Sequence, residues 1–234
     1  MAISITVNTS ASAYGVYTTG STGIWGNSAG VFNTNPGKYY LISFIADAGS
    51  NITPNSFANT LGLVNITLLT SNTLGTVKLW IYGAWGTNVN TTGAFYWSVA
   101  AAAGTQDIAF TIDEVTGAAL KPNPLVQAVT GTSGSLPFAA CGTNNLVMAW
   151  QFNNAATSSG VGTAPANSTV LTGRPAGAAS TFIRYHFTTN PTGATAFGTT
   201  AWSTIGVEIE AFAGGAAFGT APAVSSASMM GMGV

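Results

Sequence analysis

The stretch STIGVEIEAF, residues 203–212, shows the period-two alternation that decides the fold. Three aliphatic residues share one parity and the glutamates the other: Ile205, Val207 and Ile209 against Glu208 and Glu210. Strict alternation is typical of a β-strand, because successive side chains point to opposite faces of a sheet. The stretch therefore predicts a strand with one core face and one solvated face, with both glutamates on the solvated face.

Similar short apolar or alternating segments recur along the chain, and Gly, Asn, Pro and Thr separate them. Helical periodicity is nearly absent. The pattern predicts an all-β chain: a two-sheet antiparallel β-sandwich, jelly-roll-like, of about ten strands over residues 1–212, followed by an extended C-terminal arm, 213–234. The other predicted strands are 3–9, 39–46, 63–70, 76–85, 94–100, 107–113, 125–131, 146–152 and 181–189.

Charged residues make up only 5% of the chain, against about 25% in a typical soluble domain. Phosphate binding needs several Lys or Arg on one face, and the five present exclude a nucleic-acid partner. No stretch of about 20 apolar residues is present, so membrane insertion is not expected. The opening MAISITVNTS lacks the basic and apolar regions of a signal peptide.

Glu208 and Glu210 raise the question of catalysis. Side chains two positions apart on a strand lie about 6.5–7 Å apart at the backbone, a separation that an inverting glycosidase can use. A structural role is the simpler interpretation, because Arg184 lies in another predicted strand and can pair with either glutamate across strands. We therefore predict a structural ion pair between Arg184 and Glu208 or Glu210, with a glycoside hydrolase as an alternative.

No other catalytic, cofactor or metal site is predicted. His186 is the only histidine, and one histidine without a cysteine cluster does not form a usual zinc site. Cys141 lies between apolar residues and a turn, which indicates a small buried side chain. Trp80 and Trp85 could stack on a sugar, but their opposite parity favours packing in the core or between subunits.

The C-terminal arm is rich in Gly, Ala and Ser, with isolated large apolar residues at Phe218, Met229, Met230 and Met232. This apolar density is too low for the arm to fold alone. We expect these four side chains to anchor the arm on a neighbouring subunit, since Met adapts to irregular surfaces. Packing of the arm against its own sandwich is the alternative.

The order of the segments resembles a loose group of β-sandwich proteins encoded in the structural modules of tailed bacteriophages. The segments that carry the resemblance are ITVNTSASA, GKYYLISFIADAG, FYWSVAAAAGTQDIAFTID, NNLVMAWQFNNAA and WSTIGVEIEAF. It covers roughly residues 3–212 and brings no catalytic signature. It implies a virion component made in the host cytoplasm, either a head decoration (cement) protein or a tail or fibre module.

Low charge is consistent with that expectation, because densely packed copies of a strongly charged protein would repel one another. The expected function is a non-enzymatic capsid decoration protein. Its expected partners are copies of itself, in a homo-oligomer, and a major capsid or tail protein. A carbohydrate-binding or host-recognition module of a tail or fibre is the alternative.

Overall fold

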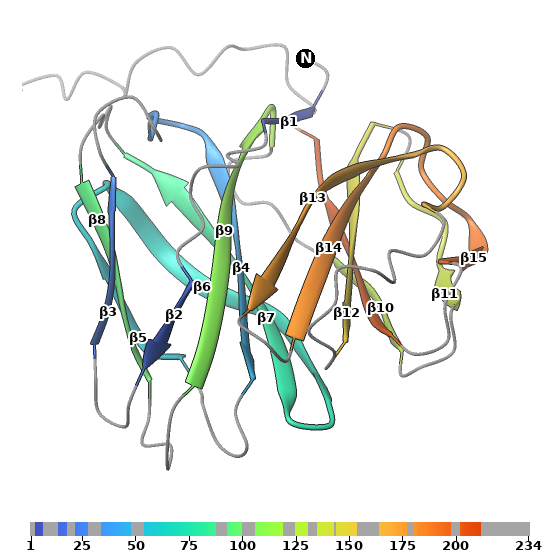
Figure 1. Cartoon of the computed structure of the whole chain (residues 1–234). Coiled ribbons are helices and arrows are strands. Elements are labelled where there is room, and N and C mark those ends of the chain that lie inside the picture. Colours follow the sequence, from blue (N-terminus) through green and yellow to red (C-terminus); the bar gives the residue numbers. More distant parts are fainter. Residues whose placement is uncertain are drawn as a thin grey trace, which may run out of the picture.

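The computed structural model describes residues 3–6, 14–17, 22–27, 34–47, 54–87, 93–99, 106–118, 125–130, 135–142, 144–153, 164–176, 180–197 and 202–211. Within these ranges the chain forms sixteen strands and no helix (Figure 1). All the strand pairings are antiparallel. The prediction of an all-β antiparallel fold is therefore confirmed. No helix in these ranges is both long and apolar enough to cross a membrane.

Two sheets form the body of the molecule. The first has the order β1 (Ser4–Thr6), β9 (Gln106–Thr116), β4 (Tyr39–Asp47), β7 (Val77–Gly86) and β6 (Leu63–Leu74), and β2 (Tyr14–Tyr17) pairs with the other end of β9. The second has the order β10 (Leu125–Thr130), β16 (Ser203–Ile209), β12 (Leu146–Asn153), β14 (Ser180–Phe187) and β13 (Ser168–Ala176).

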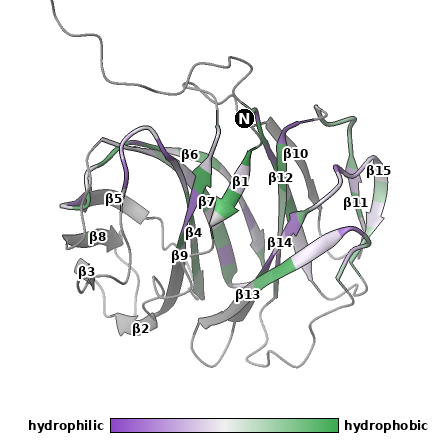
Figure 2. Cartoon of the chain, turned by 90° about the horizontal axis from the view of Figure 1, so that it is seen from above, coloured by the Kyte–Doolittle hydropathy of each residue, from purple (hydrophilic) through white to green (hydrophobic). Residues whose placement is uncertain are grey.

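Two small sheets flank this sandwich. One has the order β3 (Thr22–Asn27), β8 (Gly93–Val99) and β5 (Pro54–Asn59), and it lies beside the first sheet at the left of Figure 1. The other consists of β11 (Ser135–Phe138) and β15 (Gly193–Ala196), and it lies beyond the second sheet. Seen from above, the two large sheets stand side by side with the β11–β15 pair on the outside (Figure 2).

Apolar side chains of one parity meet between the two large sheets, as the alternation predicts. The first sheet contributes Leu41, Ile45, Val77, Leu79, Ile81 and Val115. The second contributes Leu146, Met148, Trp150, Phe152, Phe182, Ile205, Val207 and Ile209. We call this cluster the inter-sheet core. It confirms that Ile205, Val207 and Ile209 form the core face of β16.

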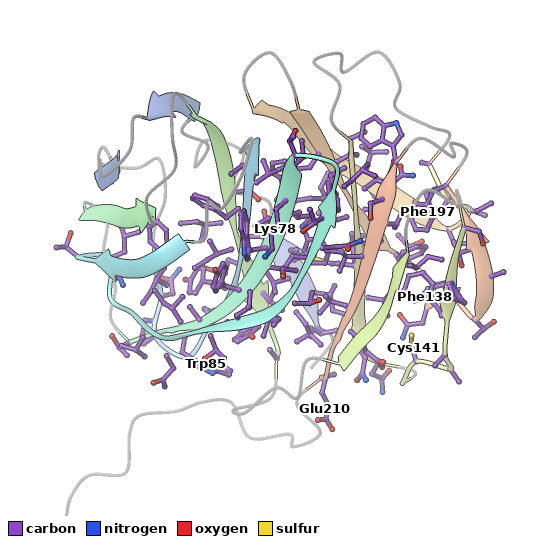
Figure 3. The ribbon with its side chains drawn as sticks, turned by 90° about the horizontal axis from the view of Figure 1, so that it is seen from below. Lys78, Trp85, Phe138, Cys141, Phe197 and Glu210 are labelled. Atoms are coloured by element: carbon purple, nitrogen blue, oxygen red, sulfur yellow. The ribbon has the colours of Figure 1, made fainter. Side chains whose placement is uncertain are left out.

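The opposite face of the second sheet is also covered. A second cluster, the outer core, contains Leu136, Phe138, Val147, Ala149, Ile183, Tyr185, Phe187, Phe197 and Trp202. In Figure 3, Phe138 and Phe197 lie between the second sheet and the β11–β15 pair. All seven residues of β16 are buried as a result. The predicted solvated face of this strand is therefore wrong, because the small sheet shields it from water.

Each predicted segment coincides with a strand, and β16 ends at Ile209 rather than at residue 212. Strands β2, β3, β5, β11, β13 and β15 were not predicted. Several of them are only four residues long or contain Gly and Pro, as in TGIWGN and STVLTGRPA, so they show little alternation. Jelly-roll connectivity stays a prediction, and the arm, residues 213–234, lies outside the described residues.

Candidate functional site

A buried ion pair joins the two large sheets. Arg184 on β14 donates from Nη1 to Oδ2 of Asp113 on β9, and both side chains are fully buried. A second polar contact crosses the same space, where Trp150 Nε1 donates to Ser43 Oγ at 2.6 Å. A third lies between Asn72 Nδ2 and Ser203 Oγ, at 2.5 Å. These bonds set how one sheet lies on the other, because hydrogen bonds are directional whereas apolar packing is not.

The predicted pairing of Arg184 with Glu208 or Glu210 is wrong. Strand β12 lies between β14 and β16, so residues of those two strands are not direct neighbours. Arg184 is in register with Trp150, and Trp150 with Ile205, which places the arginine on the inter-sheet face. Glu208 has the opposite parity on β16 and therefore points to the other face of the sheet.

Glu208 instead organises the turn that leads into β12. Its Oε1 accepts hydrogen bonds from the Gly142 backbone N–H at 2.7 Å and from Asn145 Nδ2 at 2.6 Å. Asn145 Oδ1 in turn accepts from the Ala211 N–H at 3.0 Å, and Asn190 Nδ2 donates to the Gly142 carbonyl. Glu208 is only 6% exposed. Together these bonds join the turn to the chain that follows β14 and to the chain that follows β16.

Glu210 lies in a different environment. It follows the last residue of β16 and is exposed, and its side chain points away from the sheets in Figure 3. A glycosidase needs both carboxylates in one cleft, with one of them able to donate a proton to the leaving group. Here one carboxylate is occupied by a turn and the other faces solvent.

Removal of the Glu208 side chain should destabilise the protein measurably. Glu208→Ala leaves the Gly142 N–H and the Asn145 amide without this acceptor, and we expect the free energy of unfolding to fall by about 1–3 kcal/mol. Glu210→Ala, the matched control, should change it by no more than about 0.5 kcal/mol. Urea denaturation at neutral pH measures both. Equal effects of the two variants would contradict the assignment of a structural role to Glu208 alone.

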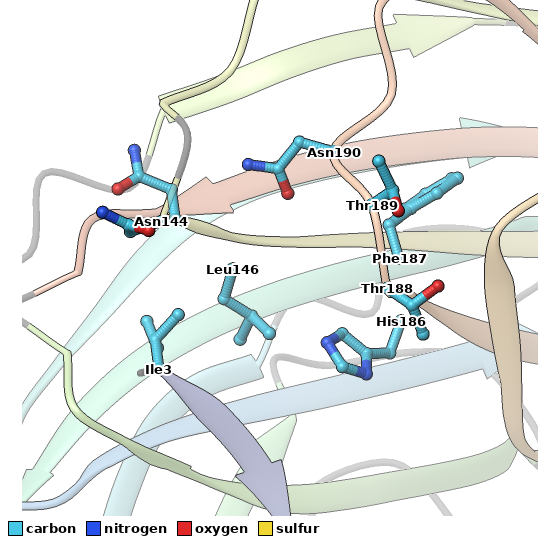
Figure 4. A pocket seen from close by; sticks show the side chains of 9 residues that line it. Ile3, Asn144, Leu146, His186, Phe187, Thr188, Thr189 and Asn190 are labelled. Atoms are coloured by element: carbon cyan, nitrogen blue, oxygen red, sulfur yellow. The ribbon is translucent and has the colours of Figure 1, made fainter. Parts of the chain in front are cut away.

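A pocket of about 470 Å³ opens beside this network, at the end of the sandwich where β1 lies. Its polar lining comes from Asn144, Asn145, His186, Thr188, Thr189 and Asn190, and its apolar lining from Ile3, Leu146 and Phe187. In Figure 4, Ile3 and His186 lie on one side of the pocket, and Asn144 and Asn190 lie on the opposite side. Neither glutamate lines it.

The titration of two lone side chains follows from burial. Burial and the neighbouring Glu208 carboxylate raise the pKa of the Cys141 thiol to about 11, so the thiolate is scarce at neutral pH. The cysteine is half-buried rather than buried as predicted.

Burial also lowers the pKa of His186 below its usual value, so the neutral imidazole predominates at pH 7. Among the described residues, no group of three or more His, Cys, Asp or Glu is arranged to hold a metal ion.

The tryptophans of β7 point in opposite directions, as their parity predicts. Trp80 is buried against Phe44 with its ring centroid 5.9 Å away, and Lys78 Nζ lies 5.0 Å from its ring. Trp85 is half-buried, with its ring 5.0 Å from that of Tyr39, and packs at the edge of the inter-sheet core. They do not form one sugar-stacking platform.

Several residues that the structure brings together were not identified as partners or site residues from the sequence. Asp113 was not recognised as the partner of Arg184, and the pocket residues Asn144, Thr188, Thr189 and Asn190 carried no motif. One signal was present for the ion pair. The segment TFIRYHF has large apolar residues at both parities, which indicates a strand buried on both faces, so a charge within it needs a buried partner.

The predicted arm anchors Phe218, Met229, Met230 and Met232 lie outside the described residues. Comparison with protein-family models, with curated proteins and with solved structures finds no match for this chain.

Proposed function

We propose that this chain is a non-enzymatic structural protein of a virus particle, a decoration (cement) protein that packs in several copies on a bacteriophage capsid. The observation that supports the proposal is the burial of its few charged side chains. Burial is described for seven charged side chains, and only Glu210 among them is exposed. The others are Lys38, Lys78, Asp113, Glu114, Arg184 and Glu208.

Internal contacts engage these charges. Glu114 accepts hydrogen bonds from Asn35 Nδ2 at 3.0 Å and from the Tyr40 hydroxyl at 2.8 Å. Lys38 Nζ lies 3.0 Å from Thr116 Oγ1. The described surface is therefore poorer in charge than the composition alone suggests. Such a surface lets copies pack closely with little electrostatic repulsion, and charged groups are depleted at the cores of protein interfaces.

Among the residues that the structure describes, the exposed large apolar side chains lie on edge strands of the two large sheets. Val64 and Leu68 are 37% and 48% exposed on β6, and Val170 is 45% exposed on β13. Edge strands carry unpaired backbone groups and are covered in many proteins by charge, proline or a partner. Apolar side chains at such edges support their burial between copies.

A decoration protein of this kind is expected to assemble independently of salt. Native mass spectrometry of the full chain should show one defined oligomer at about 50 and about 500 mM NaCl, because uncharged contacts are not screened. Leu68→Asp should shift the population towards monomer, since it places a charge in the interface. Thr192→Asp adds the same charge at an exposed position outside β6 and β13, and it should leave the oligomer intact.

The contribution of the C-terminal arm is measured in the same experiment. A chain ending at Phe212 lacks the expected anchors and should form fewer or weaker oligomers. A full-length chain that stays monomeric at every concentration tested would contradict the proposal. An oligomer that dissociates at high salt would contradict its physical basis.

A further inference from the structure

The described lining of the pocket at the end of the sandwich offers many hydrogen-bonding groups and no formally charged side chain. Its nine described lining residues include three amides, two hydroxyls and one imidazole, but no Lys, Arg, Asp or Glu. Proteins bind anions mostly through cationic side chains and hard metal ions mostly through carboxylates. The lining therefore disfavours phosphates, carboxylates and metal ions. Its polarity disfavours a purely apolar ligand as well, because the amides would lose hydrogen bonds to water that an apolar ligand cannot replace.

Three of the six polar side chains that line this pocket are held in position before any ligand arrives. Asn145 donates to Glu208 and accepts from the Ala211 N–H, which determines the orientation of its amide. Asn190 donates to the Gly142 carbonyl, and Thr188 Oγ1 donates to the Asn167 carbonyl at 2.9 Å. Each amide carries two donor hydrogens and an acceptor oxygen, so capacity for a ligand remains after these bonds. Pre-oriented groups lose little entropy on binding, which favours affinity.

The apolar part of the lining complements these groups. Ile3 and Leu146 belong to or pack against the inter-sheet core and present aliphatic surface to the pocket. A sugar ring has the matching chemistry, with hydroxyls that both donate and accept at its rim and C–H groups on its faces. The volume of about 470 Å³ lies within the range of about 300–1,000 Å³ usual for small-ligand sites.

We propose that this pocket binds a neutral saccharide, with the amides and hydroxyls around the sugar hydroxyls and the aliphatic side chains against the ring. The site is distinct from the tryptophans of β7 and from the two glutamates. The inference does not rest on the proposed assembly. A chain that assembles without binding sugar contradicts only this inference, and a monomer that binds sugar contradicts only the assembly.

The only histidine of the chain supplies a direct reporter, because His186 lines the pocket. The full chain is titrated with glucose, galactose, mannose, N-acetylglucosamine and their disaccharides, each up to about 10 mM, an upper limit suited to weak sites. Glucuronate serves as the charged counterpart. The imidazole resonances of His186 are followed by NMR, and the dissociation constant is obtained from the shifts. We expect a saturable shift with at least one neutral sugar and none with glucuronate.

Two exposed lining residues allow substitution without disturbing the core. Asn144→Ala and Thr189→Ala each remove a hydrogen-bonding group from the pocket, and each should raise the dissociation constant about 2- to 10-fold. Thr73→Ala removes an exposed threonine from β6, outside the pocket, and should leave binding unchanged. The inference is overturned if none of the neutral sugars shifts the histidine. It is equally overturned if both pocket variants bind as the parent does, or if glucuronate binds as tightly as the neutral sugar that shifts the histidine.

Discussion

Arg184→Met is expected to lower the free energy of unfolding by about 3–5 kcal/mol, which is the usual cost of removing one partner of a buried ion pair. The Asp113 carboxylate is fully buried and accepts from the Arg184 guanidinium. Without that guanidinium, the carboxylate loses a charge-assisted bond that offsets its removal from water. Urea denaturation at neutral pH, followed by tryptophan fluorescence, measures the change.

The double variant Asp113→Leu/Arg184→Met distinguishes the loss of the whole ion pair from the loss of one partner only. It removes both charges together, so we expect it to be more stable than Arg184→Met alone. Lys38→Met is the matched control, because this lysine is half-buried and hydrogen-bonded to Thr116, and it should cost about 1 kcal/mol. An Arg184→Met variant as stable as Lys38→Met would show that the pair contributes little to the sandwich.

Trp150→Ala is expected to cost about 3–5 kcal/mol, because it removes a large fully buried side chain and leaves a cavity. Trp150 lies in the inter-sheet core, where both large sheets contribute its neighbours. It also carries the hydrogen bond to Ser43 that crosses between the sheets. Loss of this residue therefore removes apolar contacts and one directional contact together.

Two further variants divide these contributions. Ser43→Ala leaves the indole in place but removes its acceptor, and it should cost about 1–3 kcal/mol. Trp85→Ala removes a half-buried tryptophan from the edge of the same core and should cost clearly less than Trp150→Ala. Thermal and urea unfolding of the three variants give the comparison. Equal effects for Trp85→Ala and Trp150→Ala would contradict the central position of Trp150.

Ten of the sixteen described strands, and the inward faces of several of them, were predictable because alternation is a local property of the chain. Val77, Leu79 and Ile81 on β7 enter the inter-sheet core as their parity requires, and so do Ile205, Val207 and Ile209 on β16. The same alternation predicted that Trp80 and Trp85 lie on opposite faces of their strand. In each case the side-chain direction follows from the extended backbone alone.

The candidate pocket could not be predicted in this way. Its residues come from just before β1, from the turn that leads into β12 and the start of that strand, and from the end of β14 and the residues after it, segments that are far apart in the chain. None of them carries a short motif with a known spacing. Their polarity alone is typical of turns, which are rich in Asn and Thr for local backbone reasons.

By itself, the sequence determined that this protein is a β-sheet protein with few charges, where ten of the sixteen described strands lie, and which face of several of them is apolar. Tertiary structure alone decided the order of the strands and the covering of the second sheet on both faces. It also decided that Arg184 meets Asp113 while Glu208 holds a turn. The physical reason is that alternation defines two faces for each strand, whereas the neighbour on each face depends on contacts between residues distant in the chain.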